Sequence, residues 1–436
     1  MSPPPANADH RGAGAAADGE DAPLLSVSGL KTHFPVNTGF IGSLTFDREG
    51  LVPVGFDSSA VRAVDGISFT LERGETFGVV GESGCGKSTV ARTLLGLEEP
   101  TAGTIEFDGE DVTTFDGEQR RWFRENVQMV FQDPQSSLNP RRTVGSIISD
   151  PLEAAGWGRE RRQQRALELL EDVGLEREYY GRYPHEFSGG QRQRINLARA
   201  LSINPDLVVA DEPVSGLDMS VKAQILRLMN DLQEEYGLTY LFITHDLGVV
   251  RNVADRVAVM YLGDFVEVGP TDRLFTDPHH PYTRELLRAV PNPDPETPEA
   301  ESHLVGDVPS PENPPTGCKF HSRCPEVVRP EGVGPDTYRR YAALRMDAVT
   351  ESLPTDGDLD AVLDDYFTER PPAPMERAVE TALRLAADGN WTAAKEALDE
   401  EATECLLAVP GQEAVDESDH VSACHLPADG RESFEG

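Results

Sequence analysis

Lysine is scarce in this 436-residue chain, and acidic residues outnumber basic residues. The five lysines are Lys31, Lys87, Lys222, Lys319 and Lys395, and all other basic residues are arginines. Asp and Glu number 76 against 39 Lys and Arg, which gives a formal net charge of -37. Because no basic stripe is available to meet phosphates, this charge argues against a nucleic-acid partner.

Two explanations fit an acidic excess of this size. Evenly spread carboxylates with few lysines are typical of a protein from a high-salt cytoplasm, where they keep the surface hydrated while salt screens their repulsion. An ordinary acidic protein from a low-salt organism is the alternative. Regular apolar blocks along the chain predict that it folds in either case.

Long apolar runs are missing as well. No stretch approaches the roughly 18 to 20 apolar residues of a membrane-spanning helix. The N-terminal residues 1–22 lack the basic-then-apolar layout of a signal peptide, and we expect this small, polar and acidic segment to be a disordered tail.

Apolar blocks alternate with amphipathic stretches over residues 23–290. Helical spacing is found in VARTLLGL, QRINLARALS and VKAQILRLMNDLQEEYG, and four nearly all-apolar blocks read as buried strands: 76–80, 127–131, 206–210 and 238–244. This alternation predicts an α/β domain with a mostly parallel central sheet. The Asp108-Gly109 pair inside IEFDGEDV predicts a hairpin turn, and hence a smaller antiparallel β subdomain.

The last third of the chain is organised differently. Residues 291–316 hold eight prolines and many acidic residues, which predicts a stiff, extended linker. A second region follows at 317–426, with helical spacing in DTYRRYAALRMDAV, LDAVLDDYF and MERAVETALRLAADG. We expect residues 427–436 to form a loose tail.

A phosphate-binding loop is the strongest chemical signal. It follows an apolar strand, opens a helix and consists of Gly81, Glu82, Ser83, Gly84, Cys85, Gly86, Lys87, Ser88 and Thr89. The glycines let the backbone wrap around phosphates, and the helix N-terminus points free N–H groups at the anion. We expect Lys87 to bind the β- and γ-phosphates of ATP and Ser88 to hold Mg²⁺. A glycine-rich turn before a helix is the structural alternative.

Two adjacent carboxylates end the strand LVVA. Asp211 and Glu212 should lie at the carboxyl edge of the sheet, beside the phosphate loop. Asp211 would orient Mg²⁺ through water, and Glu212 would act as general base on the attacking water. A strand followed by an acidic turn is the alternative for any such pair alone.

Phe187-Ser188-Gly189-Gly190-Gln191 precedes a helix upstream of Asp211. With this motif in this order, the chain resembles the ABC ATPases, which implies a P-loop NTPase fold of ABC type with an α-helical subdomain at about 133–203. A second helix N-terminus is a second anion site. In the resembling family, residues equivalent to Ser188, Gly189, Gly190 and Gln191 cover the nucleotide held by a partner subunit in a head-to-tail dimer.

Further positions match this family in sequence order. Gln132 resembles the glutamine that senses Mg²⁺ and water, and His245 resembles the histidine that contacts the γ-phosphate, although a strand-end histidine is often only structural. Asp218 lies in Ser215-Gly216-Leu217-Asp218, which resembles the loop that crosses the dimer interface but has Gly216 where alanine is common. Phe34 resembles the aromatic that stacks on adenine, with a core residue as the alternative.

Longer segments resemble the ATPases of the oligopeptide, dipeptide and nickel uptake family. They are SSLNPRRTVGSII, HEFSGGQRQR, DEPVSGLDMSVKAQIL, HDLGVVRNVADRVAVMYLGDFVEVG, HPYTRELLRAVP, GCKFHSRCP and SACHL. The resemblance implies ATP hydrolysis at the cytoplasmic face of the membrane, driving uptake of di- or oligopeptides. Its implied partners are a second ATPase subunit in a heterodimer, two membrane permeases and an extracellular substrate-binding protein. Nickel or oligosaccharide uptake, and a soluble ABC ATPase without transport, are the alternatives.

Four cysteines remain outside the phosphate loop: Cys318, Cys324, Cys405 and Cys424. Their grouping in the last third favours metal over disulfides in a cytoplasmic protein. The family's C-terminal extension has its cysteines closer together, so we interpret residues at about 327–402 as a helical insertion. The four thiols could hold a [4Fe–4S] cluster or structural zinc, or stay reduced without metal.

Overall fold

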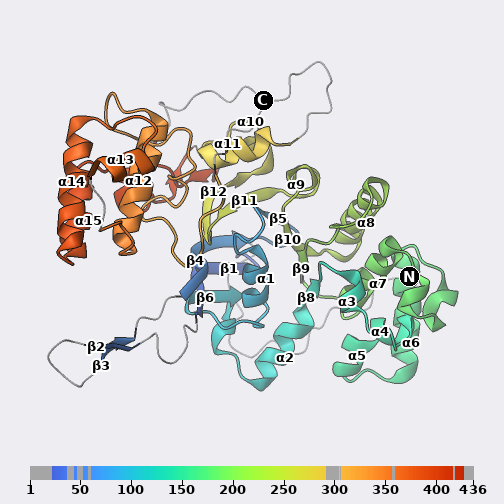
Figure 1. Ribbon diagram of the computed structural model, residues 1–436. Coiled ribbons are helices and arrows are strands. Elements are labelled where there is room, and N and C mark those ends of the chain that lie inside the picture. The colour runs from blue at the N-terminus through green and yellow to red at the C-terminus, as the bar shows by residue number, and fades with distance from the viewer. Residues whose placement is uncertain are drawn as a thin grey trace, which may run out of the picture.

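The computed structural model describes residues 22–36, 44–46, 53–56, 60–290, 304, 306–355, 359–415 and 418–426 (Figure 1). Residues 1–21 of the expected N-terminal tail, most of the expected linker and the expected tail at 427–436 lie outside these residues. None of the helices in the described ranges is long and apolar enough to cross a membrane.

A central sheet carries the expected parallel strands. Five strands run parallel in the order β11 (Arg256–Tyr261), β5 (Thr76–Val80), β10 (Thr239–Thr244), β9 (Leu207–Asp211) and β8 (Val127–Val130). Every residue of β5, β9 and β10 is buried, as their apolar sequences require. The α/β fold predicted from the sequence is confirmed, and each of the four predicted strands is found within one residue of its expected bounds.

The sheet is mostly parallel, as predicted, with an antiparallel extension at one edge. Three antiparallel strands extend it beyond β11: β12 (Asp264–Pro270), β14 (Val421–Ser422) and β13 (Glu413–Ala414). The C-terminal region therefore supplies two strands to the central sheet. Strands of two residues are too short to show an alternating pattern, which is why the sequence did not reveal them.

A smaller antiparallel sheet packs beside the central one. Its order is β4 (Ala60–Leu71), β1 (Leu25–Pro35), β6 (Ala102–Phe107) and β7 (Glu110–Asp111). Asp108 and Gly109 both have positive φ, of 51° and 79°, as a two-residue hairpin turn between β6 and β7 requires. A separate hairpin joins β2 (Leu44–Phe46) to β3 (Pro53–Phe56).

Helix α1 (Lys87–Leu94) lies between the two sheets and contacts β9 and β10 on one side and β4 on the other. Two groups of helices then flank the sheets. One is α2 (Gly117–Asn126), α3 (Pro134–Ser137), α4 (Val144–Ile148), α5 (Asp150–Ala154), α6 (Arg159–Asp172) and α7 (Gly189–Leu201). The other is α8 (Met219–Tyr236), α9 (Leu247–Val253), α10 (Thr271–Thr276) and α11 (Pro281–Arg288).

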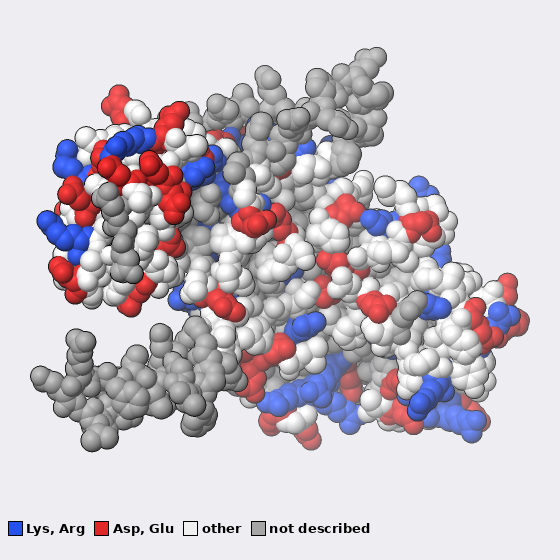
Figure 2. Space-filling view, in the orientation of Figure 1, with Lys and Arg blue, Asp and Glu red and all other residues white. Residues whose placement is uncertain are grey.

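The C-terminal region forms a helical bundle that lies on the opposite side of the cassette from α3–α7 (Figure 1). Its helices are α12 (Pro335–Val349), α13 (Leu359–Tyr366), α14 (Ala373–Ala387), α15 (Trp391–Asp399) and α16 (Glu404–Leu407). Tyr341 is fully buried, and its hydroxyl donates to the Leu398 carbonyl at 2.7 Å. Acidic side chains are scattered over the outer face of this bundle and of the cassette (Figure 2).

Candidate active site

The phosphate loop connects the end of β5 to the start of α1, as its sequence predicts. Gly81 and Gly86 adopt φ values of 157° and 113°. A β-carbon at Gly81 would lie 2.2 Å from the Met260 carbonyl oxygen, and one at Gly86 would lie 2.0 Å from the Ala63 carbonyl oxygen. No other residue type fits at these two positions without displacing backbone, so the sequence needs glycine there.

Lys87 closes the loop on itself. Its Nζ donates to the carbonyl oxygens of Gly81 and Glu82, at 2.8 and 2.9 Å, and the residue is only 5% exposed. The amine thus lies within the curve of the loop backbone, close to the N-terminus of α1. Phosphate oxygens can take the place of these two carbonyls, because an ammonium group binds anionic oxygens more strongly than neutral ones.

Ser88 and Asp211 bring two oxygen donors together beside the loop. The Ser88 hydroxyl donates to Asp211 Oδ1 at 3.2 Å, and Asp211 is 4% exposed at the end of β9. Burial raises the pKa of Asp211, and the neighbouring charge of Glu212 raises it further, against the Ser88 hydrogen bond that lowers it. Hydroxyl and carboxylate oxygens are the ligands that Mg²⁺ prefers, so this pair fits the predicted magnesium site.

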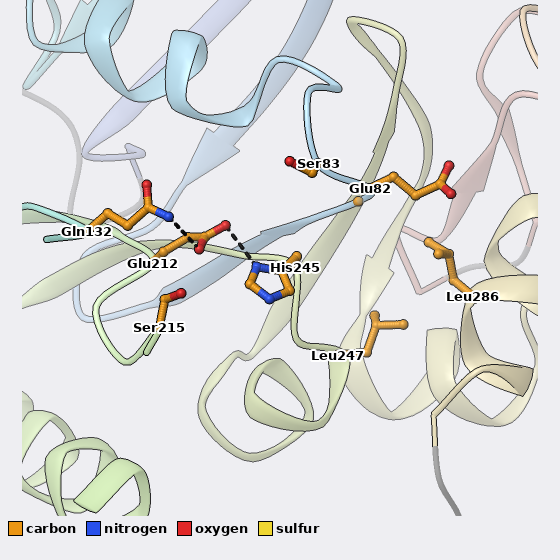
Figure 3. Close-up of a pocket in the computed structure, with 9 residues that line it drawn as sticks. Glu82, Ser83, Gln132, Glu212, Ser215, His245, Leu247 and Leu286 are labelled. Carbon is orange, nitrogen blue, oxygen red and sulfur yellow. Dashed lines mark hydrogen bonds and ion pairs between the residues drawn. The ribbon is translucent and has the colours of Figure 1, made fainter. Parts of the chain in front are cut away.

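Glu212 is held by both of the other residues that we predicted to be catalytic (Figure 3). The Gln132 amide donates to Glu212 Oε2 at 2.9 Å, and His245 Nδ1 lies 2.9 Å from Glu212 Oε1. The backbone φ of Glu212, 47°, is unusual for a residue with a side chain, and its N–H donates to the Ile243 carbonyl at 2.8 Å. Such a backbone conformation is typical of an active site, where the surrounding structure stabilises it.

A cavity of about 440 Å³ joins these groups. Its lining consists of Gly81, Glu82, Ser83, Gln132, Glu212, Ser215, His245, Leu247 and Leu286. The first three residues of the phosphate loop and the proposed catalytic trio therefore face one space. Leu247 and Leu286 carry no motif, and only the fold reveals that they contribute to it.

The signature residues are folded as a helix start but do not line this cavity. Ser188 caps α7: its hydroxyl accepts from the Gln191 N–H at 3.3 Å, and Gln191 Oε1 accepts from the Ser188 N–H at 3.0 Å. Ser188 and Gly189 are exposed. A β-carbon on Gly190 would approach Val221 of α8 to 2.4 Å, so glycine permits the close packing there.

Phe34 and Asp218 also lie outside the cavity lining, as do the predicted contacts Gly84, Cys85, Gly86, Lys87, Ser88, Thr89 and Asp211. Asp218 is exposed and caps α8, where its carboxylate accepts from the Val221 N–H at 3.0 Å; this hydrogen bond lowers its pKa. Phe34 is half-buried near the end of β1, so it is not a fully buried core residue. The structure does not gather Phe34, Asp218 and the signature residues at the cavity within one chain.

Comparison with known proteins names the family. An ABC transporter model matches residues 64–215, and a model described as the C-terminal region of oligopeptide/dipeptide transporters matches residues 266–330. The dipeptide transport ATP-binding protein DppF of Escherichia coli is 50% identical over 303 residues, which cover 69% of this chain and 86% of that protein. The chain belongs to the ATP-binding proteins of oligopeptide/dipeptide-type ABC transporters.

A second curated relative agrees with this assignment. The oligopeptide transport ATP-binding protein AppF of Bacillus subtilis is 50% identical over 311 residues, covering 70% of this chain and 90% of that protein. A solved structure of cbiO1 from Clostridium perfringens, part of an ABC transporter complex, is 26% identical and covers 58% of this chain and 90% of its own, with a TM-score of 0.48. As a member of this family the protein is an ATPase that uses ATP and Mg²⁺.

A third model, of a domain of unknown function, matches residues 325–418 of this ABC ATPase. That range begins inside the second matched region and includes helices α12–α16.

The four C-terminal cysteines of the ABC ATPase approach one another in the fold. The Cys318 N–H donates to the Cys405 carbonyl at 2.9 Å, and burial raises the pKa of Cys318 to about 12 and that of Cys405 to about 11. Cys324 is buried, which raises its pKa, and the charges of Cys318, Cys424 and Cys405 would raise it further. Within the described ranges, however, no three His, Cys, Asp or Glu residues are placed so that they could hold one metal ion.

Sequence reasoning missed two residues that contact the phosphate loop. The Glu82 carboxylate accepts two hydrogen bonds from Arg323, and the Tyr282 hydroxyl accepts one from the Glu82 N–H at 3.1 Å. Arg323 stands between Cys318 and Cys324, and Tyr282 stands in the HPYTRELL segment. Both residues lie in segments that resemble the peptide-uptake ATPases, and this was the only sequence feature that could have pointed to them. Neither their residue type nor their spacing is typical of a phosphate site.

Replacing Asp211 with asparagine should stabilise the nucleotide-free protein and abolish its Mg²⁺-dependent ATP hydrolysis. Because folding raises the pKa of this carboxyl, its contribution to stability is full below the unfolded-state pKa and is lost as the pH rises through the folded-state value. At neutral pH Asp211→Asn should therefore raise Tm by about 2 °C, as measured by calorimetry without nucleotide.

This difference in Tm should shrink as the pH is lowered toward 3.8, the ordinary pKa of the group. Asp231→Asn, at an exposed position on α8, is the control and should leave Tm unchanged at every pH. A lower Tm for Asp211→Asn than for the wild type at neutral pH would contradict the account.

Proposed function

We propose that this ATPase drives the import of di- and oligopeptides through separate membrane permeases. The observation that carries the proposal is the identity of 47–51% to proteins named as peptide transport or import ATPases, over about 70% of the chain. The match of residues 266–330 to the C-terminal region of oligopeptide/dipeptide transporters supports the same cargo class.

The side chains that line the cavity or lie beside it suggest how each step is performed. Lys87 and the backbone of the phosphate loop bind the triphosphate, with Lys87 exchanging its two carbonyl partners for phosphate oxygens. Ser88 and Asp211 would hold Mg²⁺, which neutralises charge on the β- and γ-phosphates when bound. Glu212 takes a proton from the attacking water, while Gln132 and His245 keep its carboxylate oriented.

A second subunit completes the site in this proposal. The cavity lining of this chain does not include Ser188, Gly189, Gly190 or Gln191. These residues form the capped start of α7, where Ser188 and Gly189 are exposed. Such a start attracts anions, so it would cover the γ-phosphate held by the partner. ATP then binds the closed dimer better than the open one, and hydrolysis lets the dimer open. We propose a heterodimer with a second ABC ATPase, in which Asp218 lies near the interface and Phe34 stacks on adenine.

The remaining partners follow from the transport role. Two permeases would carry the cargo path, an extracellular binding protein would deliver the peptide, and this subunit would sit at the cytoplasmic face of the membrane. Phe131, beside Gln132, is 39% exposed for a large apolar side chain, which supports a protein contact near the catalytic glutamine.

We further propose that residues at about 327–402 are an insertion within the C-terminal extension. Helices α12–α15 occupy 335–399 and pack on one another, with Tyr338 and Tyr341 fully buried among them. The separate match at 325–418 supports a boundary near the start of this range.

Glu212→Gln should bind ATP and dimerise but turn over about 100-fold more slowly, because an amide cannot accept the proton of the attacking water. Phosphate release and size-exclusion chromatography with ATP would measure both properties. Glu235→Gln, on the exposed face of α8, should match the wild type in both. ATP hydrolysis by Glu212→Gln at the normal rate would show that Glu212 is not the base.

The cargo is tested in proteoliposomes that hold this subunit, its ATPase partner, both permeases and the binding protein. Labelled dipeptide should accumulate inside with ATP, and the incorporation of Lys87→Ala should reduce uptake at least about tenfold through the loss of phosphate binding. Accumulation of nickel or an oligosaccharide, with no uptake of any peptide, would sink the peptide proposal.

The cysteine prediction has its own measurement. A [4Fe–4S] cluster or zinc bound by Cys318, Cys324, Cys405 and Cys424 would require the thiols to move from their present positions, and anaerobically purified protein would then contain iron and sulfide, or zinc. A Cys318→Ser, Cys324→Ser variant should lose this metal, whereas Cys85→Ser should retain it. Absence of iron, sulfide and zinc after gentle isolation would end the idea.

A further inference from the structure

The C-terminal extension reaches into the nucleotide site through one ion pair. The Arg323 guanidinium donates to Glu82 with both terminal nitrogens, at 2.6 Å to Oε2 and 3.1 Å to Oε1. The Arg323 side chain is only 6% exposed and that of Glu82 is 25% exposed. A two-point contact of this kind between planar groups fixes orientation as well as charge.

Glu82 connects this arginine to the lysine that binds phosphate. Its carboxylate is held by Arg323, its N–H donates to the Tyr282 hydroxyl, and its carbonyl accepts from Lys87 Nζ. The Glu82 side chain points away from Glu212 and His245 (Figure 3). Backbone and side chain of this loop residue are thus anchored on the side of the cavity opposite the catalytic carboxylate.

The segment that carries Arg323 is itself docked firmly on the cassette. Lys319 Nζ contacts Asp65 Oδ2 at 3.0 Å, Asp264 Oδ2 at 2.8 Å and the Leu262 carbonyl at 2.9 Å. Phe320 is buried against the rings of Tyr261 and Tyr282, with centroids 5.3 and 5.2 Å away. Arg323 therefore arrives at the loop already positioned, and forming the ion pair costs little side-chain entropy.

Charge makes this contact matter for the nucleotide. Glu82 lines the cavity that receives the triphosphate, and its carbonyl is one hydrogen bond from the amine that binds it. An unpaired carboxylate at this point would repel the phosphates across a space of low dielectric. Arginine is always charged, so its pairing with Glu82 cancels that repulsion at every physiological pH.

We propose that Arg323 is a positioning residue for ATP binding: it neutralises Glu82 and fixes the Gly81–Gly84 backbone around the phosphates. This rests on the proposed function only in that the cavity beside Lys87 must take ATP. The extension is then a structural part of the nucleotide site, although none of its described residues lines the cavity.

A double-mutant cycle on the full-length chain tests the proposal, with the non-hydrolysable analogue AMP-PNP and Mg²⁺ as the probe in calorimetric titrations. Arg323→Ala should weaken AMP-PNP binding on the order of tenfold, because it leaves a partly buried carboxylate unpaired beside the phosphates. Arg323→Lys keeps the charge but not the two-point contact, and should recover part of the affinity. In the Glu82→Gln background the same Arg323→Ala change should alter affinity by less than about twofold, since no charge remains to neutralise.

Steady-state hydrolysis provides a second readout. The KM for ATP should rise with the dissociation constant of AMP-PNP in Arg323→Ala, while kcat stays within about threefold of the wild type, because Glu212, Gln132 and His245 are untouched.

The extension offers a matched control. Arg345 pairs with Asp399 at 2.6 Å, with side-chain exposures of 4% and 27%, almost the same as those of Arg323 and Glu82. This pair joins α12 to α15, and Arg345 also donates to the Thr316 hydroxyl at 2.5 Å, but neither Arg345 nor Asp399 contacts the phosphate loop, so Arg345→Ala should lower Tm yet leave AMP-PNP affinity unchanged.

The failures are distinguishable. A wild-type chain that binds no AMP-PNP would overturn the proposed function itself. Wild-type binding together with unchanged affinity in Arg323→Ala would overturn the role of Arg323. Equal losses from Arg323→Ala in the wild-type and Glu82→Gln backgrounds, or an equal loss from Arg345→Ala, would assign the effect to general folding of the extension and would also overturn it.

Discussion

The structure depends on a backbone loop that is wrapped tightly enough to hold an anion. Gly81 and Gly86 permit this because a side chain at either position would strike a carbonyl oxygen at 2.2 or 2.0 Å. The loop then presents Lys87 and the N-terminus of α1 to one point in space. Asp211 and Glu212 lie beside this loop because they end β9, which is two strands from β5 in the central sheet.

Sheet order explains why the catalytic residues meet. β10 lies between β5 and β9, so the loop after β5, the carboxylates after β9 and His245 after β10 emerge side by side at one edge. Parallel strands with buried, β-branched sequences make this arrangement rigid. Glu212 can therefore hold a strained backbone, with its carboxylate hydrogen-bonded on both oxygens.

These features were accessible from sequence because each leaves a local pattern. All-apolar strands revealed the core of the sheet, and the glycine, lysine and serine spacing revealed the loop. Long-range contacts leave no such pattern. Three such contacts link segments roughly 150 to 240 residues apart. They are the pairing of β14 with β12, the hydrogen bond from Glu82 to Tyr282 and the ion pair from Glu82 to Arg323. Each forms only when the chain folds, so the sequence around either partner does not reveal it. The same limit applies to the proposed dimer, in which a partner subunit would complete the nucleotide site.

The C-terminal extension changes how this ATPase is best understood. It adds strands to the central sheet and packs Phe320 against the aromatic pair Tyr261 and Tyr282. It also supplies Arg323, which forms a salt bridge with Glu82 of the phosphate loop. The region that the sequence sets apart by its cysteines is thus joined to the central sheet and to the phosphate loop. Its helical bundle lies on the opposite side of the cassette from α3–α7 (Figure 1), but its buried side chains belong to the same apolar cluster as those of the cassette.

The most direct measurement is a structure of the Glu212→Gln chain with ATP and Mg²⁺, together with its dimer partner. The account predicts each triphosphate between Lys87 of one subunit and a serine-glycine turn of the other, with Ser188 to Gly190 serving that role for the partner's nucleotide. A structure in which Ser188 lies far from every triphosphate, in every assembly present, would contradict it.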